Sequence, residues 1–226
     1  MKEAYSVNGR ISREPATEKP HFASVAKEIL PGVTKTWHPI CIDHLELQLR
    51  ERLHVGVHEA TCPHFASTVA AKFTRFPYEI GYFEKETDAY RLLEGRGIGP
   101  PFLGHLAEEG RVIGFIIGLV TDFRHATPND FGLCRDALTK LHESGFKHGD
   151  INKHNFLIHD GRATLIDFEL MSRADASERK DELNRLIDEL RDTIRLIEEA
   201  ALWRSPSAAW SIHKRIILVE DEVARE

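Results

Sequence analysis

The chain has 226 residues, of which 42% are hydrophobic and 29% are charged, and its formal net charge is −6. This composition is typical of a soluble globular protein and excludes a mainly disordered one. Acidic and basic residues are interleaved, which argues against a nucleic-acid-binding surface. The 3 cysteines are widely spaced, so they form no disulfide framework, and the 13 histidines lack the paired spacing of a zinc site.

No segment has the properties of a membrane span or a secretory signal. The longest uncharged apolar run, residues 112–120, is too short to cross a bilayer. The amino terminus, MKEAYSVNGR, has no apolar signal core. We therefore expect a cytoplasmic or nuclear protein that is not secreted and has no membrane partner.

The first 120 residues predict an arm followed by a small sheet. Residues 1–35 contain prolines and glycines among charges without periodicity, which predicts an N-terminal arm or irregular cover. Residues 36–120 are expected to form a small antiparallel sheet with one helix. Apolar patterns indicate strands at residues 42–49, 55–57, 67–73, 102–106 and 112–120, about five in all.

The helix predicted over residues 80–94 carries an informative carboxylate. Glu86 lies on the same helical face as Phe83 and Tyr90, whereas Glu84 shares its face with Asp88. A carboxylate turned toward the interior needs a partner. We therefore expect Glu86 to contact a cation inside the protein.

Residues 121–226 are predicted to be mostly helical. Helices are expected over residues 130–145, 177–203 and 207–219, and the apolar runs 156–158 and 163–166 around Asp160-Gly161 predict a β-hairpin. The sheet-rich and helical parts are expected to form two lobes. A cleft between them is the expected ligand site.

Three oxygen-bearing side chains flank this hairpin. Asp150 and Asn155 precede it and Asp167 follows it, and the two ends of a hairpin are neighbours in space. Each residue alone would more often be a turn or cap residue. Together, however, they offer the hard oxygen ligands that suit Mg²⁺ carrying phosphates.

At these residues the sequence resembles the protein-kinase-like phosphotransferases. The catalytic loop H-x-D-x-x-x-x-N is matched by HGDINKHN, and the metal-binding D-F motif is matched within LIDFE. The strand lysine of V-A-I-K is matched by Lys72 in VAAKF, with Glu86 as its helix partner. The resemblance covers about residues 40–190.

Two features narrow the resemblance. Gly149 in HGD and Glu169 after D-F are more similar to the aminoglycoside and choline phosphotransferases than to protein kinases with H-R-D and D-F-G. The segments EKETDAYRLL, GPPFLGHL and HGDINKHNFL also resemble a fungal group of short kinase-like proteins.

The resemblance implies a fold, two cofactors and a role for each residue. It implies an α+β protein with a two-lobed protein-kinase-like fold that uses ATP and Mg²⁺. Asp150 would accept the proton of the attacking hydroxyl, and Asn155 and Asp167 would hold Mg²⁺. Lys72, fixed by Glu86, would hold the α- and β-phosphates. His148 is assigned a structural role in the catalytic loop.

Three departures from the kinase pattern affect these expectations. The phosphate-covering turn, expected at residues 50–56, has one glycine instead of several, so either Arg52 or His54 compensates or nucleotide binding is weak. Asn152 stands where a lysine usually follows the catalytic aspartate. Finally, only a short stretch follows Asp167, and it contains no A-P-E motif.

The sequence leaves three functions open. The first expectation is a phosphotransferase that moves the γ-phosphate of ATP to the hydroxyl of a small molecule. The alternatives are a compact atypical serine/threonine protein kinase, with a protein partner completing its short second lobe, and a pseudokinase that serves as a binding module.

Overall fold

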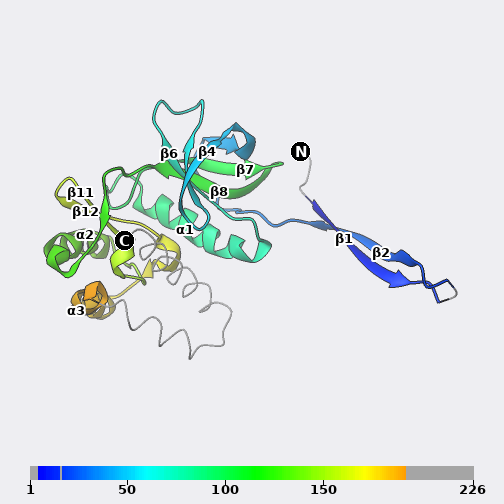
Figure 1. Cartoon of the computed structure of the whole chain (residues 1–226). Helices are drawn as coiled ribbons and strands as arrows, with labels where there is room; N and C mark the ends of the chain where they lie inside the picture. Colours follow the sequence, from blue (N-terminus) through cyan, green and yellow to red (C-terminus); the bar gives the residue numbers. More distant parts are fainter. Residues whose placement is uncertain (1–4, 16, 192–226) are drawn as a thin grey trace.

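The computed structural model describes residues 5–15 and 17–191 and has an α+β fold, as predicted. Its main sheet has six strands in the order β3-β7-β8-β6-β5-β4, and helix α1 (Ile80–Leu93) lies along one face (Figure 1). The strands are β3 (Cys41–Asp43), β4 (Gln48–His54), β5 (Val57–Thr61), β6 (Val69–Phe73), β7 (Phe102–Glu108) and β8 (Arg111–Gly118).

The prediction of one strand over residues 42–49 was wrong, and so was that of a purely antiparallel sheet. The 3₁₀ turn η1 (His44–Glu46), capped by Asp43, interrupts the alternating apolar pattern and separates β3 from β4. These two strands form opposite edges of the sheet, and β3 pairs in parallel with β7. If the sheet were flat, its two edge strands would be five strand spacings, or roughly 24 Å, apart. The segment that connects β3 to β4 can span at most roughly 19 Å. The sheet is therefore strongly curved.

Helix α1 agrees with its prediction. It follows the 3₁₀ turn η2 (Pro77–Glu79), and its apolar residues Phe83, Tyr90 and Leu93 are buried against the sheet. Glu86 is buried on the same face, with 2% of its surface exposed. The helix therefore delivers a carboxylate to the interior, as its pattern indicates.

The second part of the structure, which we call the helical region, is built on α2 (Phe131–Glu143) and α3 (Ala176–Arg191). Its predicted hairpin is confirmed, because β11 (Phe156–His159) pairs antiparallel with β12 (Arg162–Leu165). The short strands β9 (Arg124–His125), β10 (Phe146–Lys147) and β13 (Ser172–Arg173) complete it. The predicted helix at 207–219 and the end of that at 177–203 lie outside the described residues. No helix of the described part is long and apolar enough to cross a membrane.

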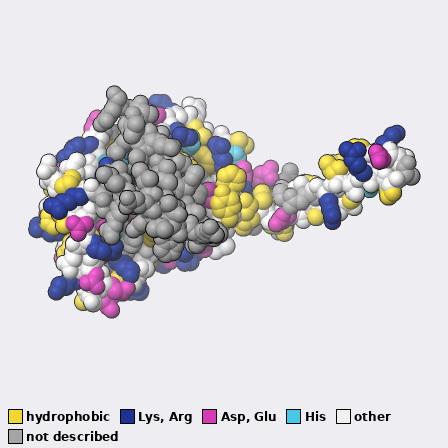
Figure 2. All heavy atoms as spheres, turned by 60° about the horizontal axis from the view of Figure 1, so that its bottom comes forward, with side chains coloured by type: hydrophobic (Ala, Val, Ile, Leu, Met, Phe, Trp, Pro, Cys, Tyr) yellow, Lys and Arg dark blue, Asp and Glu magenta, His cyan; other side chains and the backbone are white. Residues whose placement is uncertain are grey.

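The N-terminal segment is a β-hairpin, not the irregular cover that was considered. Strands β1 (Tyr5–Arg13) and β2 (Pro20–Ile29) pair with each other and project away from the body (Figure 1). Figure 2 shows hydrophobic side chains exposed along this projection. The register shifts where Arg10 pairs with Ser24 and Ile11 with Phe22, so Ala23 is an extra residue in β2. Phe22 therefore falls out of phase with Val25, and this break in the apolar alternation explains why β2 was not predicted.

Candidate active site

Lys72 lies at the centre of a buried charge cluster between β6, α1 and the end of β12. Its Nζ is 2.5 Å from a carboxylate oxygen of Glu86 and 2.7 Å from one of Asp167. Alternation along β6 turns Lys72 toward the same side of the sheet as α1, while its neighbours Ala71 and Phe73 pack on the other side. The predicted pairing of Lys72 with Glu86 is thus observed.

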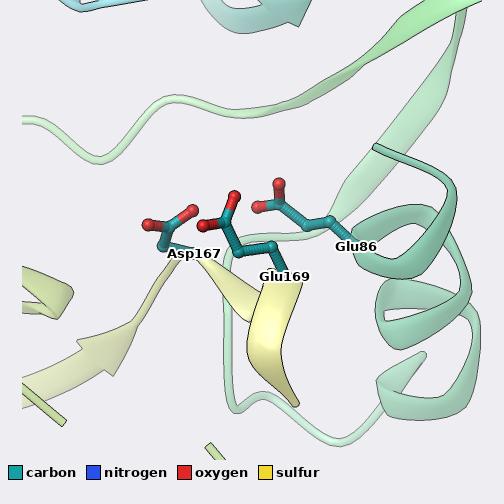
Figure 3. Close-up of side chains that lie close together, drawn as sticks. All are labelled: Glu86, Asp167 and Glu169. Carbon is teal, nitrogen blue, oxygen red and sulfur yellow. The ribbon is translucent and has the colours of Figure 1, made fainter. Parts of the chain in front are cut away.

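A third carboxylate, that of Glu169, belongs to this cluster. Oxygen atoms of Glu86, Asp167 and Glu169 lie within 4.8 Å of one another, and Figure 3 shows the three side chains facing a common space. Burial opposes the charge on Lys72, but Asp167 and Glu86 outweigh it and hold the pKa of the ammonium well above its usual range. Lys72 is therefore positively charged at neutral pH.

Asp167 sits at a sharp change of direction in the chain. Its backbone is left-handed, with φ 68° and ψ 62°, at the junction between β12 and the 3₁₀ turn η5 (Phe168–Leu170). This conformation is strained for a non-glycine residue and is often found at functional sites. The next residue, Phe168, is fully buried and contacts the rings of Tyr90 and His148. These contacts fix Asp167 relative to α1.

Asp150 and Asn155 are bonded to each other within the loop that precedes β11. Asn155, in the 3₁₀ turn η4 (Lys153–Asn155), donates from Nδ2 to the backbone oxygen of Asp150 at 2.8 Å and to its Oδ2 at 3.1 Å. Ile166 donates its backbone N–H to the backbone oxygen of Asn155 at 3.1 Å. The loop is therefore tied to the residue just before Asp167, as expected for the two ends of a hairpin.

His148 supports this loop, in agreement with its predicted structural role. The backbone N–H of Asp150 donates to Nδ1 of His148 at 3.3 Å. Nε2 of the His148 ring consequently carries the proton and donates to the backbone oxygen of Ile166 at 3.0 Å. The side chain is fully buried, so it braces the loop from behind.

Glycine is required at position 149 for a steric reason. Gly149 has φ +86°, and a Cβ atom there would lie 2.6 Å from the backbone oxygen of Leu170. The loop therefore packs directly on η5, just after Asp167. This close approach explains why HGD, and not H-R-D, occurs in this chain.

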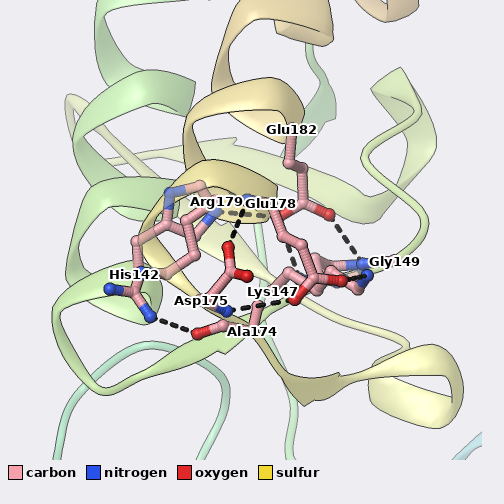
Figure 4. Close-up of polar contacts among 9 residues, drawn as sticks. His142, Lys147, Gly149, Ala174, Asp175, Glu178, Arg179 and Glu182 are labelled. Atoms are coloured by element: carbon pink, nitrogen blue, oxygen red, sulfur yellow. Dashed lines mark hydrogen bonds and ion pairs between the residues drawn. The ribbon is translucent and has the colours of Figure 1, made fainter.

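A buried carboxylate from α3 holds the same loop, and the sequence reasoning missed it. Glu182 accepts hydrogen bonds from the backbone N–H groups of His148 at 3.0 Å and Gly149 at 2.7 Å (Figure 4). The ring of His142, on α2, lies 2.8 Å from the same carboxylate. Burial opposes the charge on Glu182, but the hydrogen bonds from His142 and the backbone outweigh it and lower its pKa.

The signal for Glu182 was present in the sequence. It precedes Leu186 by four residues, so it falls on the apolar stripe of α3, as Glu86 falls on that of α1. Glu169 was noted only as a feature of the LIDFE motif. Its position in the charge cluster depends on the 3₁₀ turn η5, which the sequence pattern did not predict.

A pocket lies between the sheet and the helical region, with the charge cluster at its polar end. Lys72, Glu86, Asn155 and Asp167 line it, whereas Asp150 does not. Asp150 is buried and bonded to Asn155, with 8% of its surface exposed. Apolar side chains form most of the remaining wall, including Leu53, Val57, Ala70, Ile117, Leu119 and Leu157.

The prediction that the phosphate-covering turn spans residues 50–56 was wrong, because the turn is shorter. Residues 50–54 belong to strand β4, and the turn itself consists of Val55 and Gly56. Of the two candidates for compensation, His54 lines the pocket, while Arg52 is exposed and does not.

The donor set fits Mg²⁺. Asp167 and Asn155 are hard oxygen donors at the polar end of the pocket, and Glu169 adds a third within the same cluster. Because the amide nitrogen of Asn155 is held by Asp150, its Oδ1 is the atom for coordination. Mg²⁺ needs only one or two such ligands when it carries phosphates.

The comparison with known families agrees with this geometry. Residues 134–202 match the lipopolysaccharide kinase (Kdo/WaaP) family, which is protein-kinase-like, and the match includes the catalytic loop and the LIDFE segment. The predicted resemblance to the protein-kinase-like superfamily is therefore confirmed over this part of the chain. The prediction that this enzyme is a kinase is thereby confirmed. No curated protein matches this chain. The narrower resemblance to short fungal proteins stays a prediction.

Proposed function

We propose that this protein uses ATP and Mg²⁺ to phosphorylate a hydroxyl group of a small molecule. One observation carries the proposal: Lys72 is held between Glu86 and Asp167 at the end of an apolar pocket, next to the bonded pair Asp150 and Asn155. This arrangement supplies charge and alignment, which are the main requirements of phosphoryl transfer.

The nucleotide is proposed to lie between two lobes that meet near residue 120. Its adenine would occupy the apolar part of the pocket, between the sheet and Leu157. Lys72 would bind the α- and β-phosphates, with Glu86 fixing its position. The carboxylates that now contact Lys72 keep it charged and correctly oriented before the nucleotide binds.

Asp150 is proposed to orient the acceptor hydroxyl and to take its proton as the oxygen attacks the γ-phosphorus. The bond from that phosphorus to the β-γ bridging oxygen breaks, and ADP leaves. Asn155 fixes the Asp150 carboxylate by its hydrogen bond to Oδ2. Mg²⁺, held by Asp167 and Asn155, would neutralise charge on the phosphates.

A sugar-like acceptor is favoured over a protein. The matched family is named for a lipopolysaccharide kinase. In addition, only residues 168–175 separate Asp167 from α3, and all of them are described. This connection is too short for the long segment on which protein kinases dock a peptide, so it supports a small acceptor.

The decisive experiment compares the wild type with Asp150→Ala and with Asp136→Ala, an exposed aspartate of α2. Phosphate transfer from labelled ATP is measured against a pool of sugars and metabolites and, in parallel, against a protein extract. Asp150→Ala should lower kcat by about 10³-fold and leave the affinity for ATP·Mg unchanged, while Asp136→Ala behaves as wild type.

Three results would contradict the proposal. Equal turnover of wild type and Asp150→Ala would remove Asp150 as the base. Label in the protein extract alone would identify a protein kinase instead. Thermal stabilisation by ATP·Mg without any transfer to either pool would indicate a binding module.

A further inference from the structure

The turn between β4 and β5 is too short to cover a nucleotide. It consists of Val55 and Gly56 only, and the backbone oxygen of Gly56 accepts a hydrogen bond from the N–H of Phe73 at 2.9 Å. The turn is thus tied back to β6. Gly56 has φ +70°, so its glycine serves the geometry of this turn. Backbone groups of a flexible glycine-rich loop are therefore not the phosphate ligands here.

The strand register brings one polar side chain of this hairpin to the phosphate end of the pocket. His54 pairs with Val57, and Val57 pairs with Lys72. Residues that are directly opposite on neighbouring strands point to the same face of a sheet. His54 therefore lies in one row with Lys72, two strand spacings or roughly 10 Å away.

Arg52, the alternative ligand, faces the other way. It pairs with His58, which pairs with Ala71 on the side of the sheet that faces away from the pocket. Arg52 is two positions before His54, but the register shifts between them, and Arg52 is exposed and absent from the pocket wall. A cation on that face cannot reach a phosphate held by Lys72.

We infer that the side chain of His54 binds the outer phosphates of the nucleotide. It thereby takes the role that the backbone groups of a glycine-rich loop would have. This inference rests on the proposed function, because it assumes that Lys72 holds the inner phosphates. An imidazole donates an N–H whether it is neutral or charged. The roughly 10 Å between the two positions leaves room for a phosphate chain that runs from the Lys72 ammonium toward the His54 ring.

The experiment measures the affinities of ATP·Mg, ADP·Mg, AMP and adenosine by calorimetry. The variants are His54→Ala, His54→Gln, which keeps an N–H donor, and Leu53→Ala, a neighbouring apolar residue of the pocket wall. We expect His54→Ala to weaken ATP·Mg about tenfold or more, as for loss of a hydrogen bond to a charged group. AMP and adenosine should bind as in wild type, and His54→Gln should recover part of the loss. Leu53→Ala should weaken all four ligands alike.

Each other outcome overturns the inference in a different way. An equal loss for adenosine and ATP·Mg in His54→Ala would make His54 part of the apolar wall. Unchanged affinity for ATP·Mg in this variant would remove His54 as a ligand and leave the proposed function intact. A wild type that binds none of the four ligands would overturn the proposed function together with the role of His54.

Discussion

Two buried glutamates flank the candidate site, and the protein stabilises their charges in different ways. Glu86, on α1, is paired with the ammonium of Lys72 at 2.5 Å. Glu182, on α3, is held by the backbone N–H groups of His148 and Gly149 and by the ring of His142. Both carboxylates are almost fully buried, so each needs these partners.

The difference matches what each region has to do. An ion pair keeps a charged side chain ready for a ligand, because Lys72 can exchange a carboxylate oxygen for a phosphate oxygen. Backbone donors have no such freedom, so a carboxylate bound to them fixes the path of the chain. The Glu86 region therefore holds charge for the nucleotide, whereas the Glu182 region holds the shape of the loop that carries Asp150.

Replacing the two glutamates is the strongest way to test this division. Glu182→Ala would leave two backbone N–H groups unbonded in the interior, at a cost of about 1–3 kcal/mol each. We expect the free energy of unfolding to fall by about 4 kcal/mol and kcat to fall strongly, with little change in the KM for ATP. Chemical unfolding and steady-state kinetics measure the two effects.

Glu86→Gln is the matched variant from the other region. It retains the shape of the side chain but weakens the hold on Lys72, so the KM for ATP should rise more than in the Glu182 variant. If Glu86→Gln lowered kcat alone, or Glu182→Ala raised the KM alone, the division of roles would be wrong. His142→Ala should reproduce part of the Glu182→Ala loss, since it removes one of the three donors.

The same contrast explains what the sequence could predict. Glu86 was found because helical periodicity puts it among apolar residues and because its partner belongs to a known motif. Glu182 satisfies the same periodicity, but its partners are backbone amides, which no sequence motif identifies. Hairpin β11–β12 was predicted from its local pattern, whereas the edge-to-edge crossing from β3 to β4 depends on the curvature of the whole sheet. Short-range patterns thus fixed the elements but not how distant strands pair.

His105 is a buried, uncharged side chain that, like Glu182, accepts hydrogen bonds from two backbone N–H groups. His105, on β7, accepts hydrogen bonds from the backbone N–H groups of Trp37 at 3.0 Å and His38 at 3.1 Å. Burial, with a smaller contribution from His38, lowers the pKa of His105 from 6.5 to about 4. The folded protein therefore keeps His105 neutral at a pH at which the unfolded chain takes up a proton.

The sign of the pH effect follows from this difference. The contribution of His105 to stability is complete above pH 6.5, decreases as the pH falls toward 4, and is then constant. The full change corresponds to about 3 kcal/mol. His105→Gln keeps an acceptor for the two N–H groups but does not titrate, so its stability should vary less over this range. Parallel curves of unfolding free energy against pH for the two proteins would rule out His105 as the cause.

The smallest effect is expected in the projecting hairpin, whose described side chains are exposed. Phe22, on β2, is 68% exposed, whereas Phe115, on β8, is fully buried beneath α1. Phe22→Ser should change the free energy of unfolding by no more than about 0.5 kcal/mol, whereas Phe115→Ala should cost about 3–5 kcal/mol. Turnover by the Phe22 variant should equal that of wild type, because none of the described hairpin residues lines the pocket. A loss of stability in Phe22→Ser close to that in Phe115→Ala would mean that the hairpin is packed in solution and is not an independent projection.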